Sequence, residues 1–158
     1  VSKQNEFLRL DFPKDTLKKI DVSADIRNGF DIPPVEAFKG KTDYLFVFDT
    51  EKQIQNAQPI MENIAALGGR GVIITAKGEN VDFVSRFFTP QCGVDEDPVT
   101  GSAHTTLTPY WSEKLGKTKL TAMQLSQRSG YLECELAGDR VLIRGQAKLY
   151  LTGELHIE

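Results

Sequence analysis

The stretch SAHTTLTPYWSEKL, residues 102–115, predicts a buried helix. Gly116 follows it and is a typical helix stop. A proline at position 109 would remove the backbone bond to residue 105 and ordinarily kinks a helix, at a cost of about 3 kcal/mol. Surrounding structure must therefore hold this helix in place. The apolar residues near helical spacing are Ala103, Leu107, Tyr110, Trp111 and Leu115.

Strands are predicted on both sides of this helix, because apolar and polar residues alternate there. The alternating stretches are FLRLDF (7–12), FVSRFF (83–88), KLTAMQL (119–125), YLECEL (131–136), RVLIRG (140–145) and AKLYLTGEL (147–155). DYLFVF (43–48) and GVIIT (71–75) are nearly continuous apolar runs. Short breaks with glycine join the last four alternating stretches, which suits antiparallel hairpins.

Other helical signals are few. Residues 15–20 carry a weak one, while 51–57 and 59–67 carry clearer ones, with Pro59 expected in a first turn. An apolar helix flanked by antiparallel strands predicts a sheet that curves around it. The expected fold class is therefore α+β, a strongly curved, mostly antiparallel sheet wrapped around a central helix.

Length and composition restrict the function before any motif is considered. The 158 residues fit a single domain, 1–158, and 40% hydrophobic with 26% charged residues is ordinary for a soluble chain. A net charge of -3 and no dense basic run make nucleic acid a poor candidate partner. No apolar stretch approaches the roughly 20 residues that span a membrane, and the start VSKQNEF is unlike a signal peptide. We therefore expect a cytoplasmic protein without a membrane partner.

The two cysteines predict neither a disulfide nor a metal site. Cys92 and Cys134 lie outside any CxxC pair that would indicate zinc or redox chemistry. We expect both to be reduced thiols. Cys134 alternates within a predicted strand and is expected to fill space in the core.

The stretch GVDEDPVTGSAH, residues 93–104, concentrates groups that carry chemistry. Asp97 precedes a proline and is biased toward extended geometry, whereas Thr100, Gly101 and Ser102 lie where the helix should begin. Unpaired backbone N–H groups and the positive end of the helix dipole together form an anion site. Gly101 lets a carboxylate or phosphate approach the backbone closely. We call the N–H groups at Gly101 and Ser102 the anion cradle.

The neighbouring acids complicate this interpretation. If Asp95, Glu96 and Asp97 were all ionised and faced the cradle, they would repel a bound carboxylate. At least one must be neutral or turned away, and the acids are then candidate proton carriers beside an anion site. In the alternative interpretation, Thr100 merely caps the helix and the acids complement its dipole. His104, one turn into the helix, could donate to a ligand or bond a neighbouring backbone group.

Several stretches in this order resemble one protein family. They are SRFFTP (85–90), GVDEDPVTGSAH (93–104), PYW (109–111), LGKT (115–118) and QLSQRSGYL (124–132), with LRLDFP, DYLFVF and DRVLIRGQA in matching places. Together they resemble the second half of the phenazine-biosynthesis PhzF-like isomerases, over nearly the whole chain. The resemblance implies a diaminopimelate epimerase-like fold. That fold has two pseudo-symmetric halves, each a curved sheet on a central helix, with the active site in the cleft between them.

The resemblance also implies an activity. It is an isomerase reaction by proton transfer at carbon on a small carboxylate-bearing substrate, with no cofactor and no metal. Carried over to this chain, Asp97 is the catalytic acid, and Gly101 and Ser102 bind the substrate carboxylate. We add His104 as a further substrate-binding candidate. Neither Cys92 nor Cys134 matches the paired cysteines of the related epimerases, which argues against racemisation by thiols.

The same resemblance implies that this chain corresponds to one half only. The main catalytic glutamate and a Gly-His-Ala-Thr motif are expected in a first half that is absent here. That half is therefore an expected partner, and a homodimer is a further expectation. Two alternatives remain open, a non-catalytic binder of small carboxylates and an assembly module that pairs with a separate first-half chain.

Overall fold

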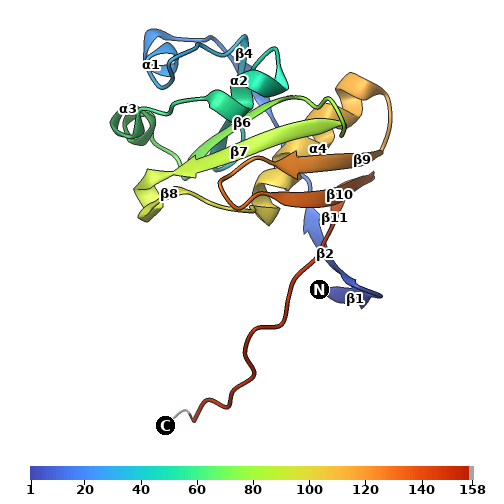
Figure 1. Cartoon of the computed structure of the whole chain (residues 1–158). Coiled ribbons are helices and arrows are strands. Elements are labelled where there is room, and N and C mark those ends of the chain that lie inside the picture. The colour runs from blue at the N-terminus through green and yellow to red at the C-terminus, as the bar shows by residue number, and fades with distance from the viewer. Residues whose placement is uncertain (157–158) are drawn as a thin grey trace.

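A computed structural model, which describes residues 1–156, shows one large sheet with four helices on its faces (Figure 1). The strands are β1 (Ser2–Gln4), β2 (Phe7–Pro13), β3 (Lys18–Ile20), β4 (Glu36–Lys39), β5 (Asp43–Val47), β6 (Gly71–Lys77), β7 (Phe83–Thr89), β8 (Val94–Glu96), β9 (Lys119–Gln124), β10 (Gly130–Ala137) and β11 (Arg140–Gly145). The helices are α1 (Ala24–Arg27), α2 (Glu51–Asn56), α3 (Met61–Ala66) and α4 (Gly101–Leu115). Among these residues, no helix is both long and apolar enough to cross a membrane.

The sheet has the order β1-β2-β11-β10-β9-β7-β6-β5-β4-β3, and β8 pairs with β7 beside this path. Within the described chain, β5–β6 and β7–β9 are parallel and the other neighbours are antiparallel. The α+β class, the mostly antiparallel sheet and the β9-β10-β11 hairpins are thus confirmed.

The central strands β5 and β6 are buried on both faces. Leu45 and Ile73 pack with Leu107 of α4 on one face. Phe46 and Ile74 pack on the other face with residues of α1, α2 and α3. Two buried faces require apolar side chains in both phases of a strand. This is why the sequence shows nearly continuous apolar runs here instead of alternation.

Helix α4 is buried as its sequence predicts, and its contacts reach β2, β5, β9, β10 and β11. Pro109 cannot donate to the carbonyl of Thr105, and the N–H of Asp15 donates to that carbonyl instead, at 3.1 Å. The chain that leaves β2 therefore compensates for the proline. Gly116 ends the helix in the left-handed conformation, at φ 65°. The further prediction that the sheet wraps strongly around α4 goes beyond these contacts and stays a prediction.

Three local predictions were wrong. Residues 15–20 form no helix, because Lys18–Ile20 pairs with β4 as strand β3. Pro59 lies outside α3 and forms an isolated bridge with Phe30. Residues 147–155 form no strand, because β10 and β2 already occupy both sides of β11. This last segment leaves the body as an extended chain (Figure 1).

Candidate active site

The 93–104 motif lies where strand β7 changes its pairing partner from β9 to β8. The first residues of β7 pair with β9, from Phe83 to Ser85. Its last residues, Phe88 and Thr89, pair with β8. Between these pairings, the carbonyl of Phe87 accepts the N–H of Asp97 at 3.0 Å. The chain therefore turns from β8 into α4 at a split in the sheet, with Asp97 fixed in that split.

Asp97 and Thr100 are joined directly. The Thr100 hydroxyl donates to Oδ2 of Asp97 at 2.6 Å. That hydroxyl makes no capping bond to the helix, so the interpretation of Thr100 as a simple helix cap is wrong. The first N–H groups of a helix have no partner within the helix. Because the Thr100 hydroxyl donates to Asp97 and caps no N–H group of the helix, its side chain does not occupy the N–H groups of the cradle.

The side chain of Gln124 fixes the backbone between Asp97 and Thr100. Gln124 was not among the predicted site residues. It is fully buried at the end of β9. Its Oε1 accepts the N–H of Thr100 at 2.8 Å, and its Nε2 donates to the carbonyl of Asp97 at 2.7 Å. The signal in the sequence was a polar residue in the buried phase of an alternating strand, after Leu120 and Ala122. Such a residue needs hydrogen-bond partners, and here they are the backbone of the motif.

The three neighbouring acids have different surroundings. Glu96 accepts from Nε and Nη2 of Arg86 at 2.7 and 3.0 Å. Nη1 of Arg86 also donates to the carbonyls of Ile54 and Ala57. Asp95 is exposed. Glu96 is therefore neutralised by an internal cation, and Asp97 is the acid that lies at the start of α4.

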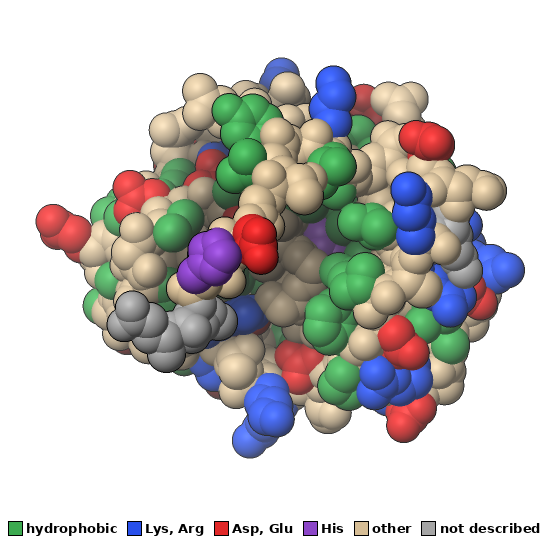
Figure 2. Space-filling view, turned by 90° about the horizontal axis from the view of Figure 1, so that it is seen from below, with side chains coloured by type: hydrophobic (Ala, Val, Ile, Leu, Met, Phe, Trp, Pro, Cys, Tyr) green, Lys and Arg blue, Asp and Glu red, His purple; other side chains and the backbone are tan. Residues whose placement is uncertain are grey.

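Gly101 and Ser102 form the first turn of α4 and are half-buried. A Cβ at Gly101 would meet only Leu10, at 3.4 Å, so packing does not require a glycine there. Ser102 also lines a cavity of about 240 Å³ that contains both Lys14, Lys41 and Arg70 and the acids Asp15 and Asp43, of which Asp43 is paired with Arg70. Figure 2 shows the face of the molecule toward which α4 begins, and that face is hollowed near its centre.

His104 lies behind the cradle, inside the protein. It is fully buried, and its Nδ1 lies 2.8 Å from the carbonyl oxygen of Thr100. A carbonyl only accepts hydrogen bonds, so Nδ1 carries the proton. Nε2 is buried without a hydrogen-bond partner in the described chain. Of the two roles open in the sequence, the structure places His104 in the bond to the backbone, and its contact with substrate stays a prediction.

Burial lowers the pKa of His104 from 6.5 to about 4. The unfolded chain therefore binds a proton in a pH range where the folded protein does not, and folding stability is lost as the pH falls from about 6.5 to 4. We expect a loss of at most about 3 kcal/mol. Urea unfolding at a series of pH values measures it. His104→Gln should flatten this dependence, whereas the exposed control His156→Gln should keep it. An equally steep profile in both variants would contradict the assignment.

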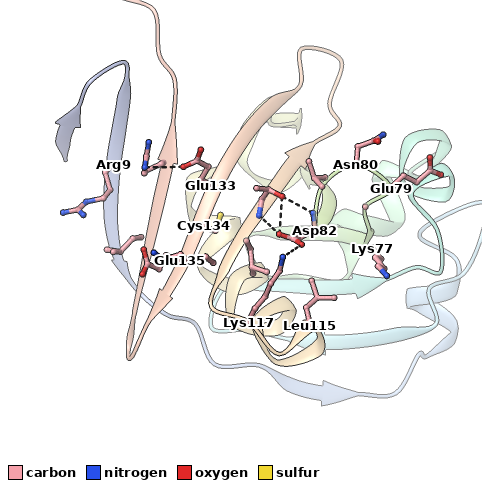
Figure 3. Close-up of a pocket in the computed structure, with 17 residues that line it drawn as sticks. Arg9, Lys77, Glu79, Asn80, Asp82, Leu115, Lys117, Glu133, Cys134 and Glu135 are labelled. Carbon is pink, nitrogen blue, oxygen red and sulfur yellow. Dashed lines mark hydrogen bonds and ion pairs between the residues drawn. The ribbon is translucent and has the colours of Figure 1, made fainter.

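A larger cavity, about 650 Å³, lies away from the cradle, between β9, β10, β11 and the β6–β7 loop (Figure 3). Two of the acids that line it form ion pairs inside the cavity, Asp82 with Lys117 and Glu133 with Arg144. Asp82 accepts from Lys117 and from the N–H of Thr121, which lowers its pKa against the raising effect of burial. Burial raises the pKa of Cys134 to about 12, which leaves it protonated and unreactive. We therefore do not place the chemistry there. Within residues 1–156, no group of three His, Cys, Asp or Glu could hold a metal ion.

Known proteins resemble this chain over nearly its whole length. Residues 8–153 match the model of the PhzC-PhzF family, described as phenazine biosynthesis-like protein. The chain belongs to this family. It is 44% identical over 157 residues to an uncharacterized isomerase of Pseudomonas aeruginosa, covering 99% of this chain and 60% of that protein. An uncharacterized isomerase of Halalkalibacterium halodurans is 41% identical over 158 residues, covering 98% and 60%.

A solved structure also resembles this PhzF-family chain. The crystal structure of a PhzF-family phenazine biosynthesis protein of Enterococcus faecalis superposes with a TM-score of 0.92 at 41% identity. That match covers 99% of this chain and 60% of the other. This PhzF-family chain therefore spans about 60% of the length of the relatives it matches. The family and the fold of this part are shown, and the activity of a whole family protein is a proposal for this chain.

Proposed function

We propose that this chain forms one side of the active site of a PhzF-family isomerase that moves a proton between carbons of a small carboxylate without a cofactor. The observation that supports this most is the bond from Thr100 to Asp97 at the start of α4. It places one carboxyl group beside the cradle, while Glu96 is neutralised by Arg86. Relatives named isomerases agree with the reaction class.

The chemistry follows from these two groups. A base removes a proton from a carbon of the substrate, the electron pair shifts along the conjugated system, and an acid returns a proton to a different carbon. Nothing is oxidised or reduced. Asp97 is one of the two proton carriers, and a positioned group of this kind contributes about 10² to 10⁴ in rate. The N–H groups of Gly101 and Ser102 hold the substrate carboxylate and stabilise charge that develops on it.

The second proton carrier is proposed to lie outside this chain. Asp97 and the cradle would both lie on one side of the bound substrate. A proton returned to another carbon needs a group on the opposite side of the substrate. The part of the family proteins that this chain does not span is where we place that group, as the first half implied by the sequence resemblance. The sheet wrapped around α4 belongs to the same proposal.

The binding step can be tested on this chain alone. We expect small carboxylates to shift the amide resonances of Gly101, Ser102 and Ala103, because the first N–H groups of α4 converge there. The measurement is a titration with a cyclic unsaturated carboxylate, followed by ¹H–¹⁵N correlation spectra. The control is the corresponding amide of the same ring. Shifts concentrated elsewhere, with this turn unchanged, would contradict the cradle.

The chemical step requires a longer polypeptide. We expect this chain alone to exchange no carbon-bound hydrogen of a carboxylate panel in D₂O, while a polypeptide that also contains the first half exchanges it. Proton NMR follows the loss of signal. Binding without exchange by both proteins would favour the alternative, a non-catalytic carboxylate binder.

A further inference from the structure

A cavity with three cations lies directly beside the cradle. Ser102 belongs to the first turn of α4, and it also lines the cavity of about 240 Å³ that contains Lys14, Lys41 and Arg70. A group held at the N–H of Ser102 therefore lies at the wall of this cavity. Pockets that enclose a whole drug-sized ligand measure about 300–1,000 Å³. The smaller cavity beside Ser102 is suited to one end of a ligand whose other end lies outside it.

The two acids of this cavity already have partners in the protein. Asp43 is buried and accepts from Nε and Nη2 of Arg70, the first at 2.9 Å. Asp15 accepts the N–H of Lys41 at 3.2 Å and the hydroxyl of Thr106 at 2.9 Å. Both carboxylates therefore bind groups other than the lysine side chains.

The two lysine side chains of the cavity have no acid of their own. Among the ion pairs formed within residues 1–156, none includes the ammonium group of Lys14 or of Lys41. Three cations against two acids leave the lining with one positive charge in excess. The positive end of α4 adds to this charge. The cavity therefore favours an anion that is not one of its own side chains.

Arg70 connects this cavity with the proposed catalytic acid. Its Cζ atom lies 5.3 Å from the centre of the Phe87 ring, and the carbonyl of Phe87 accepts the N–H of Asp97. The hydrogen bonds to Asp43 raise the pKa of Arg70 against the lowering effect of burial, and the charges of Cys92 and Asp97 raise it further. The guanidinium is thus always charged. Its Nη1 forms no hydrogen bond within the described chain and can therefore donate to a ligand.

We propose that the substrate of this site is a small dicarboxylate, whose second carboxylate binds in the cavity formed by Arg70, Lys14 and Lys41. The first carboxylate lies on the N–H groups of Gly101 and Ser102, and for this placement the inference rests on the proposed function. Hydrogen bonds between a carboxylate and a charged donor are roughly twice as strong as neutral ones, so the cavity selects for the second acid group.

Matched acids test the second carboxylate on this chain. The probes are succinate, glutarate and adipate, each compared with its monomethyl ester, which has the same carbon chain and one charge less. We expect at least one diacid to bind about tenfold more tightly than its ester, because its second carboxylate gains charge-assisted hydrogen bonds. Calorimetric titration measures the dissociation constants. A preference below about twofold for all three diacids would overturn the proposal.

NMR spectra of the same titrations locate the two carboxylates. The diacid is expected to shift the amide resonances of Gly101, Ser102 and Thr105 together with the Nε–H resonance of Arg70. The ester should shift the resonances of the cradle and leave Arg70 unchanged. A diacid that binds more tightly without shifting Arg70 or Thr105 would place its second carboxylate elsewhere and would overturn the proposal.

Charge-removing variants test the cations. Lys14→Gln combined with Lys41→Gln should reduce the diacid preference to below about threefold and leave ester binding unchanged. The control is Lys52→Gln, an exposed residue of α2, which should keep the preference of the parent. Arg70→Gln is combined with Asp43→Asn, because Asp43 would otherwise be buried without a counter-charge. An unchanged preference in the double lysine variant would overturn the proposal even if the Arg70 variant does not fold.

The second carboxylate and the proposed function can fail separately. Equal binding of diacid and ester, with shifts at Gly101 and Ser102, would overturn the second carboxylate and leave the cradle in place. Diacid binding with shifts at Arg70 but none at Gly101 and Ser102 would contradict the cradle, and with it a substrate that spans both places.

Discussion

Replacing Asp97 by asparagine in the polypeptide with both halves should slow exchange of carbon-bound hydrogen at least about tenfold. Asparagine has nearly the same size and still accepts the hydrogen bond from Thr100, but it carries no exchangeable acid proton. The measurement is the initial rate of deuterium uptake from solvent into the substrate, followed by proton NMR.

The matched control is Asp95→Asn. Asp95 is two residues away and exposed, so the same chemical change should leave the exchange rate within about twofold. Full activity of Asp97→Asn would mean that Asp97 carries no proton in the reaction and contributes only its charge at the start of the helix. Exchange by the 158-residue chain alone would show that both proton carriers lie within it.

Replacing Gln124 by methionine should destabilise this chain by about 3 kcal/mol. Methionine keeps the volume but cannot bond to the N–H of Thr100 or the carbonyl of Asp97, and both groups would be left without partners. An unsatisfied buried polar group costs roughly 1–3 kcal/mol. The free energy of unfolding in urea measures the effect.

The control for this substitution is Gln127→Met, three residues further along the chain. Gln127 is exposed, so its variant should stay within about 0.5 kcal/mol of the parent. The Gln124 variant should also bind carboxylates more weakly, because the turn that presents the cradle is no longer fixed. A loss below about 1 kcal/mol would mean that the turn is held by its other contacts.

The elements that the sequence predicted well are those with a strong local period. Helix α4 and strands β2, β10 and β11 repeat apolar residues at the spacing of their own structure, and their neighbours along the chain reinforce the pattern. The tail at 147–155 has an equally clear period and yet forms no strand. A strand exists only with a partner, and periodicity says nothing about whether an edge is open.

The site was predictable only in part. The motif 93–104 revealed the helix start and the acid beside it, because these features are adjacent in sequence. Which acid is neutralised depends on Arg86, and Arg86 is in turn held by the carbonyls of Ile54 and Ala57, 32 and 29 residues away. His104 could be interpreted in two ways until its depth was known. Contacts between residues so far apart in the sequence, and the burial of a side chain, arise from the packing of the sheet. No local sequence pattern encodes them.

The pairing of β2 with β11 has a consequence for how the protein is made. Arg140 at the start of β11 bonds Asp11 in β2, a partner 129 residues earlier. During synthesis, Asp11 leaves the ribosome 129 residues before Arg140, so β2 can pair with β11 only after β11 has been translated. Pairings of such long range fold slowly and leave an apolar strand open in the meantime. One edge of β2 thus stays open while the intervening residues are translated, which is the interval in which a chaperone would find it.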